Sequence, residues 1–323
     1  MKLDANQIIA HLESLKYLPS LSESQRWWPK YLFHFTDVKN AARILNTGFF
    51  ESRNRLIENG NLPVDIADAS VLANTDADVF DHVRFYFRPL TNMQYQNEGI
   101  IVGNQRPHCP VPVVFLMDAK RIVSKEDTKF SNGNLGASGV LRGNDYQFFS
   151  SIPFENVYHN IAYPSRKVKF NRHAEVIVPN ELTTDYVKTV WCRSQAEYRT
   201  LMELINYEVI ESFSTKIGVA QKFPLFFKKR FYVENVTLTE HKATFSFNKH
   251  CSICGPFRSR IEVSKIGDHQ SSPYFWEDDS FTFSGDFVLN VQNIPFNKEY
   301  LIKLFLDGNL VFQDKYIDFS DLF

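Results

Sequence analysis

The stretch Asn171-Arg-His-Ala-Glu175-Val-Ile-Val-Pro179 contains a short apolar run that begins at Ala174 and has a single glutamate near its start. Consecutive apolar, β-branched residues over such a length are typical of a buried strand. A carboxylate in such a strand is costly without a partner, because burial removes the water that stabilises its charge. Glu175 therefore either points to solvent from a half-exposed strand or lies inward as part of a functional site.

Two earlier segments also place polar residues beside expected strands. In Tyr31-Leu-Phe-His34-Phe-Thr36-Asp-Val-Lys-Asn40, a short β-like run leads into a helix that we expect to end at Gly48. His34 and Thr36 occupy alternate strand positions, so their side chains should point the same way and could hydrogen-bond a ligand. The alternative is that a histidine between aromatic residues is structural. The second segment, Val83-Arg-Phe-Tyr86-Phe-Arg88-Pro-Leu90-Thr-Asn-Met93, reads as an aromatic strand.

The composition describes a well-cored chain of about two domains, with 323 residues and 44% hydrophobic content. Neither a signal peptide nor an apolar run long enough to span a bilayer is present, so we expect a cytoplasmic protein without a membrane partner. Four cysteines are too few for a disulfide framework, and we expect reduced thiols.

Periodicity predicts an α+β domain in the first part of the chain. Residues 4–17 form an amphipathic pattern, with Asp4 and Gln7 placed as a capping pair. Another capping pair, Ser194 and Glu197, opens a later helix. The β-rich segments are 83–88, 111–117, 157–163 and 174–178, and the polar segments 51–80 and 127–147 are expected to be loops.

The pattern changes near residue 225 to short alternating strands. These strands centre on Phe231/Val233, Phe245/Phe247, Ile261/Val263, Phe281/Phe283, Phe287/Leu289/Val291, Leu301 to Phe305 and Leu310 to Phe312, with a turn at Asp307-Gly308. The spacing is typical of an antiparallel β-sandwich of immunoglobulin-like type. We therefore expect one domain over residues 1–220 and a second over residues 221–323, with the boundary somewhere in 213–228.

The net charge of −1 gives no global attraction to nucleic acid, but basic residues cluster locally. One run, Arg166, Lys167, Lys169 and Arg172, immediately precedes Glu175. A second region, 212–233, contains five basic residues and no acid, with phenylalanines among them. Basic side chains bind phosphates and aromatic rings stack on unpaired bases, so both patches suit a single-stranded nucleic acid. The alternative for the second region is solvated lysines over core phenylalanines.

The three segments, in this order, resemble the DarT family of nucleic-acid ADP-ribosyltransferases, toxins related in fold to the diphtheria-toxin and poly-ADP-ribose polymerase group. His34, Thr36 and Asn40 match a His-x-Thr-x3-Asn element. Phe85-Tyr86-Phe87 and the residues up to Met93 match an aromatic strand followed by a Pro-Arg-Ser-Pro-Met turn. The run from Ala174 to Pro179 matches the strand that supplies the catalytic glutamate. The resemblance covers about residues 30 to 182.

The resemblance implies a split-sheet ADP-ribosyltransferase fold and NAD as the substrate. Within it, His34, Thr36 and Asn40 would hold NAD, and Tyr86 would pack on the nicotinamide. Glu175 would stabilise the positive charge that develops on the ribose as nicotinamide leaves. The family's arginine is replaced by Leu90, and Arg88 is the expected substitute as a catalytic residue.

The same resemblance implies that the loop before the glutamate helps to choose the acceptor. Here that loop carries Arg166, Lys167, Lys169 and Arg172, and the expected acceptor is a base of single-stranded DNA or RNA. Such a protein would be the toxin of a toxin–antitoxin or phage-defence system. The C-terminal domain would then bind the cognate antitoxin, with or without a chaperone.

Two other functions stay open at this point. The first is an inactive module that binds NAD or nucleic acid without turnover, and the second is an ADP-ribosyltransferase that modifies protein. A zinc site is a third consideration, because Cys251 and Cys254 form half of a zinc motif. His241 or His269 would have to complete it, and we favour a turn without metal.

Overall fold

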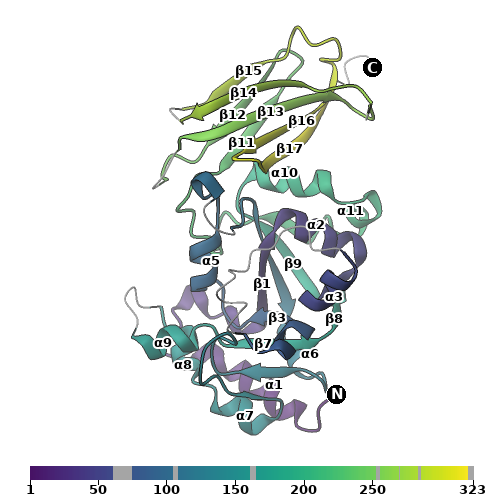
Figure 1. Cartoon of the computed structure of the whole chain (residues 1–323). Coiled ribbons are helices and arrows are strands. Elements are labelled where there is room, and N and C mark those ends of the chain that lie inside the picture. Colours follow the sequence, from purple (N-terminus) through teal and green to yellow (C-terminus); the bar gives the residue numbers. More distant parts are fainter. Residues whose placement is uncertain are drawn as a thin grey trace. The chain divides into compact units, whose positions relative to one another are not determined.

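The computed structural model describes residues 1–60, 75–104, 108–160, 165–251, 255–268, 270–282 and 285–318 (Figure 1). The contacts divide the chain into two compact units. The first comprises Met1–Phe35, Arg43–Gln96 and Val114–Val190, and the second comprises Thr36–Ala42, Asn97–Val113 and Trp191–Phe323. The predicted boundary near residue 220 stays a prediction.

The first unit is built on one sheet with neighbouring strands in the order β9-β4-β1-β3-β7-β5-β6. Strands β1 and β3, β3 and β7, and β5 and β7 are antiparallel pairs. The strand bounds are β1 Tyr31–Asp37, β3 His82–Tyr86, β4 Pro112–Asp118, β5 Lys129–Ser131, β6 Arg142–Gly143, β7 Glu175–Pro179 and β9 Val187–Cys192. A separate small ladder pairs β2 Phe49–Glu51 with β8 Glu181–Thr183.

Short helices connect and cover these strands, and Figure 1 shows α1 and α7 side by side. Their bounds are α1 Ala5–Ser14, α2 Val38–Thr47, α3 Arg53–Glu58, α5 Asn92–Asn97, α6 Ala119–Val123, α7 Tyr146–Ser151, α8 Phe154–Tyr158 and α9 Arg166–Asn171. The core between sheet and helices is aromatic. The ring of Phe149 lies 4.9 Å from that of Phe130, 5.2 Å from that of Phe154 and 6.0 Å from that of Phe87. Burial of such large apolar side chains is the main stabilising contribution to this unit.

Helix boundaries agree with the sequence in some places and differ in others. Helix α2 ends before Gly48, whose φ of +79° needs a glycine, as expected. Asp4 is the N-cap residue of α1, as predicted, but its side chain makes no capping hydrogen bond and accepts from the N–H of Tyr146 instead. The predicted strand at 157–163 is wrong where it is described, since Val157 and Tyr158 belong to helix α8; residues 161–164 lie outside the described part.

The second unit contains two antiparallel sheets, with strand orders β11-β12-β15 and β14-β13-β16-β17. The strands are β11 Val233–Leu238, β12 Lys242–Phe247, β13 Phe257–Lys265, β14 Tyr274–Phe281, β15 Phe287–Asn290, β16 Glu299–Leu306 and β17 Asn309–Ile317. Helices α10 Gln195–Leu204 and α11 Tyr207–Phe213 and strand β10 Ile217–Val219 precede them. The predicted turn is confirmed: Asp307 and Gly308, with φ of 48° and 79°, connect β16 to β17.

The cysteines differ from expectation at one position. Cys109 and Cys192 are buried free thiols, as predicted. Cys251 is disulfide-bonded, so the prediction of a reduced thiol is wrong there, and Cys254 lies outside the described residues. In the part of the chain that the structure describes, none of the helices combines the length and apolarity needed to span a bilayer.

Candidate active site around Glu175

Glu175 is the first residue of β7 and is fully buried, so its carboxylate points inward. The register of β3 and β7 sets Tyr86 directly opposite Glu175 and Arg84 opposite Ile177. Directly opposed residues share a face of a sheet, and residues two apart on one strand do so as well. Arg84, Tyr86 and Glu175 therefore project from the same face.

Arg84 forms the ion pair that stabilises the buried carboxylate of Glu175. Its Nε lies 2.6 Å from Oε2 of Glu175 and its terminal nitrogen lies 2.7 Å from Oε1, a two-point contact between two planar groups. The Arg84 side chain is 29% exposed, whereas that of Glu175 is 0% exposed. The pair thus reaches solvent only on the arginine side.

The backbone supplies the remaining contacts of Glu175. The N–H of Leu135 donates to Oε1 at 3.3 Å, and the N–H of Glu175 itself donates to Oγ of Ser131 at 3.0 Å. Ser131 in turn donates to the carbonyl of Gly133 at 2.7 Å. The segment from Ser131 to Leu135, here called the 131–135 loop, therefore contacts Glu175 from the side opposite β3, the strand that carries Arg84.

Charge and burial also set the protonation of the two neighbours on β3. Burial opposes the charge of Arg84, but the Glu175 carboxylate outweighs it and raises the pKa of the guanidinium. For Tyr86, burial first and the Glu175 charge second raise the pKa of the phenol. Arg84 therefore stays charged, and half-buried Tyr86 keeps a hydroxyl proton to donate.

Helix α9 presents the predicted basic run just before β7. Its first turn is capped by Ser165, whose side chain accepts from the N–H of Val168. Arg166, Lys167 and Lys169 are exposed. Arg172 follows the helix, is half-buried, and donates from Nε to the carbonyl of His159 at 2.8 Å. The first three residues form the exposed basic face of α9, and the fourth contacts the end of α8.

Helix α9 is also joined to the 131–135 loop. Asn171 is buried; its side chain donates to the carbonyl of Asn132 at 2.7 Å and accepts from Asn156 at 3.0 Å. Gly133 lies so close to the ring of Phe170 that an added Cβ would be 2.2 Å from it. The loop that holds Glu175 and the helix that carries the basic residues are thus packed as one piece.

The family model for DarT, described as ssDNA thymidine ADP-ribosyltransferase, matches residues 33–224. This stretch is more than half of the chain and contains His34, Tyr86 and Glu175. The chain belongs to the DarT family. By family it is an ADP-ribosyltransferase.

Solved structures give the same fold for the DarT part of the chain. DarT from Thermus sp. 2.9, in complex with ADP-ribosylated ssDNA, is 15% identical, with 62% of this chain and 97% of that chain covered at a TM-score of 0.50. DarTG from Thermosipho africanus, in complex with ADP-ribose, is 16% identical, with 65% of this chain and 53% of that chain covered at a TM-score of 0.48. No curated protein matches the sequence.

His34, the first residue of the DarT motif, lies in an aromatic environment. Its ring centroid is 5.3 Å from that of Phe50 and 5.8 Å from that of Phe85, and its Nδ1 is 3.1 Å from the carbonyl oxygen of Arg84. Burial lowers the pKa of His34 to about 4, so the imidazole is neutral at physiological pH. Phe33 pairs with Tyr86, so alternation places His34 on the opposite face of the sheet from Glu175.

Thr36 and Asn40, the other motif residues, flank the junction of β1 and α2. Thr36 is buried in β1 and Asn40 is half-buried in the first turn of α2. Both belong to the second unit by contacts, whereas His34 and Glu175 belong to the first. Their assignment to NAD therefore stays a prediction that rests on the DarT motif.

Arg88, the predicted catalytic arginine, does not lie beside Glu175 in this structure. Its buried guanidinium donates to the carbonyls of Val157 at 3.1 Å and His159 at 2.8 Å, and it lies 5.2 Å from the ring of Trp28. Burial, with Arg172 nearby, lowers the pKa of Arg88 to about 9. These contacts hold the end of α8 and favour a structural role.

Arg84 is the residue near Glu175 that sequence reasoning missed. Arg84, Tyr86 and Arg88 alternate along one strand, so the period of two allowed either arginine to join the site. The end of β3 at Tyr86 separates them, because Arg84 lies within the strand and Arg88 beyond it. Leu90, at the family's arginine position, has a φ of 58° and donates its N–H to Gln94 at 3.1 Å. A DarT site without the usual arginine thus has a different arginine on its glutamate.

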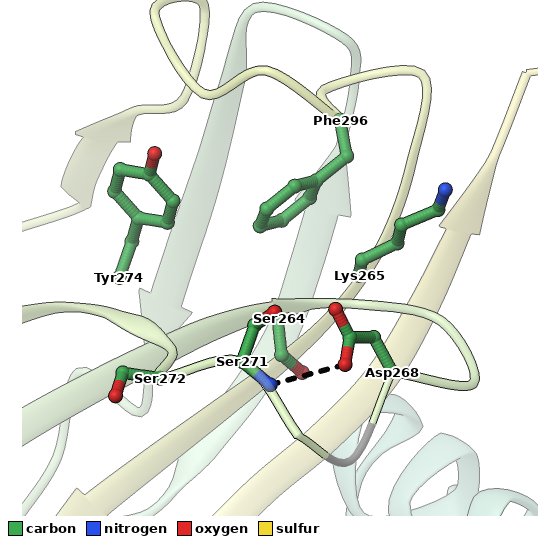
Figure 2. A pocket seen from close by; sticks show the side chains of 7 residues that line it. All are labelled: Ser264, Lys265, Asp268, Ser271, Ser272, Tyr274 and Phe296. Carbon is green, nitrogen blue, oxygen red and sulfur yellow. Dashed lines mark hydrogen bonds between the residues drawn. The ribbon is translucent and has the colours of Figure 1, made fainter.

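The remaining candidate features are metal-ligating groups and a cavity in the second unit. Across the described ranges, no three His, Cys, Asp or Glu side chains are grouped closely enough to hold a metal ion. A surface cavity of about 280 Å³ lies in the second unit, lined by Lys265, Asp268, Tyr274 and Phe296 together with three serines (Figure 2). Asp268 there accepts from the N–H of Ser271 at 3.1 Å. The sequence predicted none of the lining residues as site residues.

Proposed function

We propose that this chain transfers ADP-ribose from NAD to a base of single-stranded DNA, with Glu175 as the catalytic residue. The observation that carries the proposal is a fully buried carboxylate at the start of β7, held by Arg84 and the 131–135 loop. A buried ionised group held in one geometry is the form of an electrostatic catalyst, because no solvent has to reorganise during the reaction.

The proposed reaction breaks the bond between C1′ of the ribose and the nicotinamide nitrogen. The bonding pair leaves with nicotinamide, which becomes neutral, and the ribose carries positive charge that Glu175 stabilises. A nucleophilic atom of the base then bonds to C1′ and loses its proton to solvent. Tyr86 lies opposite Glu175 with its hydroxyl protonated, so it is suited to pack on or donate to the donor substrate.

The acceptor in this proposal lies along α9. Arg166, Lys167 and Lys169 are exposed there, and exposed cations beside a reaction centre suit a phosphate backbone. The family description names ssDNA thymidine, so thymine in DNA is the acceptor we propose, and RNA and protein are the outcomes it is tested against. The family motif assigns His34, Thr36 and Asn40 to NAD. Because His34 lies on the other face of the sheet from Glu175, we propose that it supports β3 through the carbonyl of Arg84 and does not touch the reacting ribose.

We extend the proposal to the biological role. Membership of the DarT family is the ground on which we propose a toxin–antitoxin or phage-defence role. The antiparallel sheets of the second unit are proposed to have an immunoglobulin-like arrangement and to bind the antitoxin. Loss of antitoxin binding after substitution of exposed residues in those sheets would be the supporting result.

The experiment is a comparison of acceptors with a matched pair of glutamate variants. Purified protein is incubated with labelled NAD and, separately, single-stranded DNA, RNA and protein. We expect label on DNA, and Glu175→Gln should reduce it by about 100-fold or more, the usual effect of removing one electrostatic group from such a site. Glu181→Gln, which alters a glutamate paired at 2.9 Å with Arg55 at the surface of the same unit, should leave labelling unchanged.

Label on RNA or protein alone would contradict the proposed acceptor. Nicotinamide release without label on any polymer would contradict transfer to a polymer. Binding of NAD without either product would support an inactive binding module instead.

A further inference from the structure

We propose that Arg84 is the positioning residue for Glu175, keeping that carboxylate ionised and in one orientation before NAD binds. The inference rests on the proposed function, because it assigns a role through Glu175. It starts from a pair whose members are not equally buried: the carboxylate is sealed from solvent and the guanidinium is not.

The geometry of the pair restricts Glu175 to one orientation. Two parallel contacts, of 2.6 and 2.7 Å, hold a planar carboxylate against a planar guanidinium and remove its freedom to rotate. The N–H of Leu135 at 3.3 Å is the third contact, from the loop side. A lysine could supply the charge but not this planar, two-point contact.

The charge of Arg84 is as necessary as its shape. Burying the Glu175 carboxylate, which is 0% exposed, has a desolvation cost. The backbone N–H of Leu135 at 3.3 Å offsets this cost only in part. The other titratable groups that face Glu175 are Tyr86 on β3 and His173 just before β7. Tyr86 is neutral, and burial lowers the pKa of His173, so the cation comes from Arg84.

The exposed fraction of Arg84 shows how the donor substrate reaches a sealed carboxylate. Of the two paired side chains only Arg84 is in part exposed, so in this proposal NAD meets the guanidinium before the carboxylate. Arg84 can turn outward about its own side-chain torsions and bind a phosphate of NAD, an anion that matches the guanidinium as the carboxylate does. In this proposal, the binding of NAD and the exposure of the Glu175 carboxylate occur in the same step.

The test measures nicotinamide release from NAD as a function of pH for the full chain and for Arg84→Gln and Arg84→Lys. Without its cation, the buried carboxylate should take up a proton more readily. Arg84→Gln should therefore lose about 100-fold in rate near pH 7 and recover part of it as the pH rises to about 9. Arg84→Lys should lose only about 10-fold and keep the wild-type pH profile, because the charge remains and the two-point contact is lost.

The matched control is Arg142→Gln. Arg142 is also in the first unit, is 27% exposed, and contacts two carboxylates, Asp76 at 3.2 Å and Asp78 at 2.7 Å, but it does not contact Glu175. We expect wild-type rate and pH profile from it. Thermal unfolding of all variants identifies any that fail to fold. If Arg84→Gln does not fold, the test rests on the rate and pH profile of Arg84→Lys, which keeps the buried charge paired.

Wild-type rate and pH profile in Arg84→Gln would overturn the inference, as would equal losses without a pH shift in Arg84→Gln and Arg142→Gln. Nicotinamide release is read separately from label on DNA. Failure of the wild-type chain to label DNA would contradict the proposed acceptor, whereas the Arg84 result would still be read from NAD cleavage.

Discussion

Glu175 and His34 are both titratable side chains packed into the sheet, but their surroundings affect charge in opposite ways. Glu175 has a guanidinium at 2.6 Å, whereas His34 has the rings of Phe50 and Phe85 around it. A buried charge is stable only with such a partner. Glu175 is thus suited to work as an anion, and His34 is suited to work as a neutral hydrogen-bonding ring.

The protonation of His34 gives a prediction for stability. Burial lowers its pKa to about 4, below the ordinary value of 6.5, so in this window the unfolded chain binds more protons than the folded one. The free energy of unfolding should therefore be fully present above pH 6.5 and fall as the pH drops towards 4, by on the order of 2 kcal/mol from this residue. Urea denaturation of the wild type and His34→Leu at both ends of the window measures it as a difference. An identical pH dependence in both proteins would show that the ring is not desolvated.

At the scale of elements, α9, the 131–135 loop and the start of β7 act as one packed unit. Asn171 connects them through Asn132 and Asn156, and Phe170 packs on Gly133. Helix α9, proposed to bind the acceptor, and Glu175, the proposed catalytic residue, are therefore positioned by the same contacts. A substitution that disturbs α9 should therefore also alter the position of Glu175.

Asn171→Ala tests this connection. It removes both hydrogen bonds of a side chain that is 4% exposed and leaves the carbonyl of Asn132 without that donor. We expect the free energy of unfolding to fall by about 1–3 kcal/mol, with a loss of transferase activity beyond what instability explains. Chemical denaturation and initial rates on folded protein measure the two effects. Lys167→Ala, exposed on the same helix, should change stability by less than about 0.5 kcal/mol; equal effects from the two variants would contradict the connection.

Local patterns predicted some elements well and others not at all. The consecutive apolar, β-branched residues in 174–178 and the glycine at 48 predicted β7 and the end of α2 correctly, because β-propensity and positive φ are local properties. Residues 157–158 were misread as strand because their helix ends on a distant contact: Arg88 holds the carbonyls of Val157 and His159. Ser194 caps α10 as predicted, but the Glu197 side chain binds Arg193 and not the cap. Which of the two alternating arginines meets Glu175 depends on where β3 ends, at Tyr86, and the strand period does not predict that end.

At the scale of the whole molecule, the sequence pattern did not predict how the contacts divide the chain. The regular spacing of strands after residue 231 predicted β11 to β17, because each strand alternates and ends in a turn. The units are discontinuous: Thr36–Ala42 and Asn97–Val113 belong to the second. Such a division depends on contacts between distant segments, and no composition shift marks it.

The net charge of −1 leads to a prediction for DNA binding by the whole chain. Without global attraction, salt-dependent affinity must come from local cations, and three are exposed on α9: Arg166, Lys167 and Lys169. Neutralising about three phosphates of single-stranded DNA gives a slope of about −2 in a plot of log affinity against log salt concentration. Replacing all three by glutamine should bring the slope close to zero, and fluorescence anisotropy over a salt series measures it. An unchanged slope would place the DNA on another surface, such as the basic region 212–233.

The most direct test of the central claim, catalysis by Glu175, is mass spectrometry of a thymidine-containing single-stranded oligonucleotide after incubation with NAD. The account predicts an ADP-ribose adduct on a base with the wild-type chain, none above background with Glu175→Gln, and a wild-type yield with Glu181→Gln. An adduct formed by Glu175→Gln at the wild-type rate would contradict it.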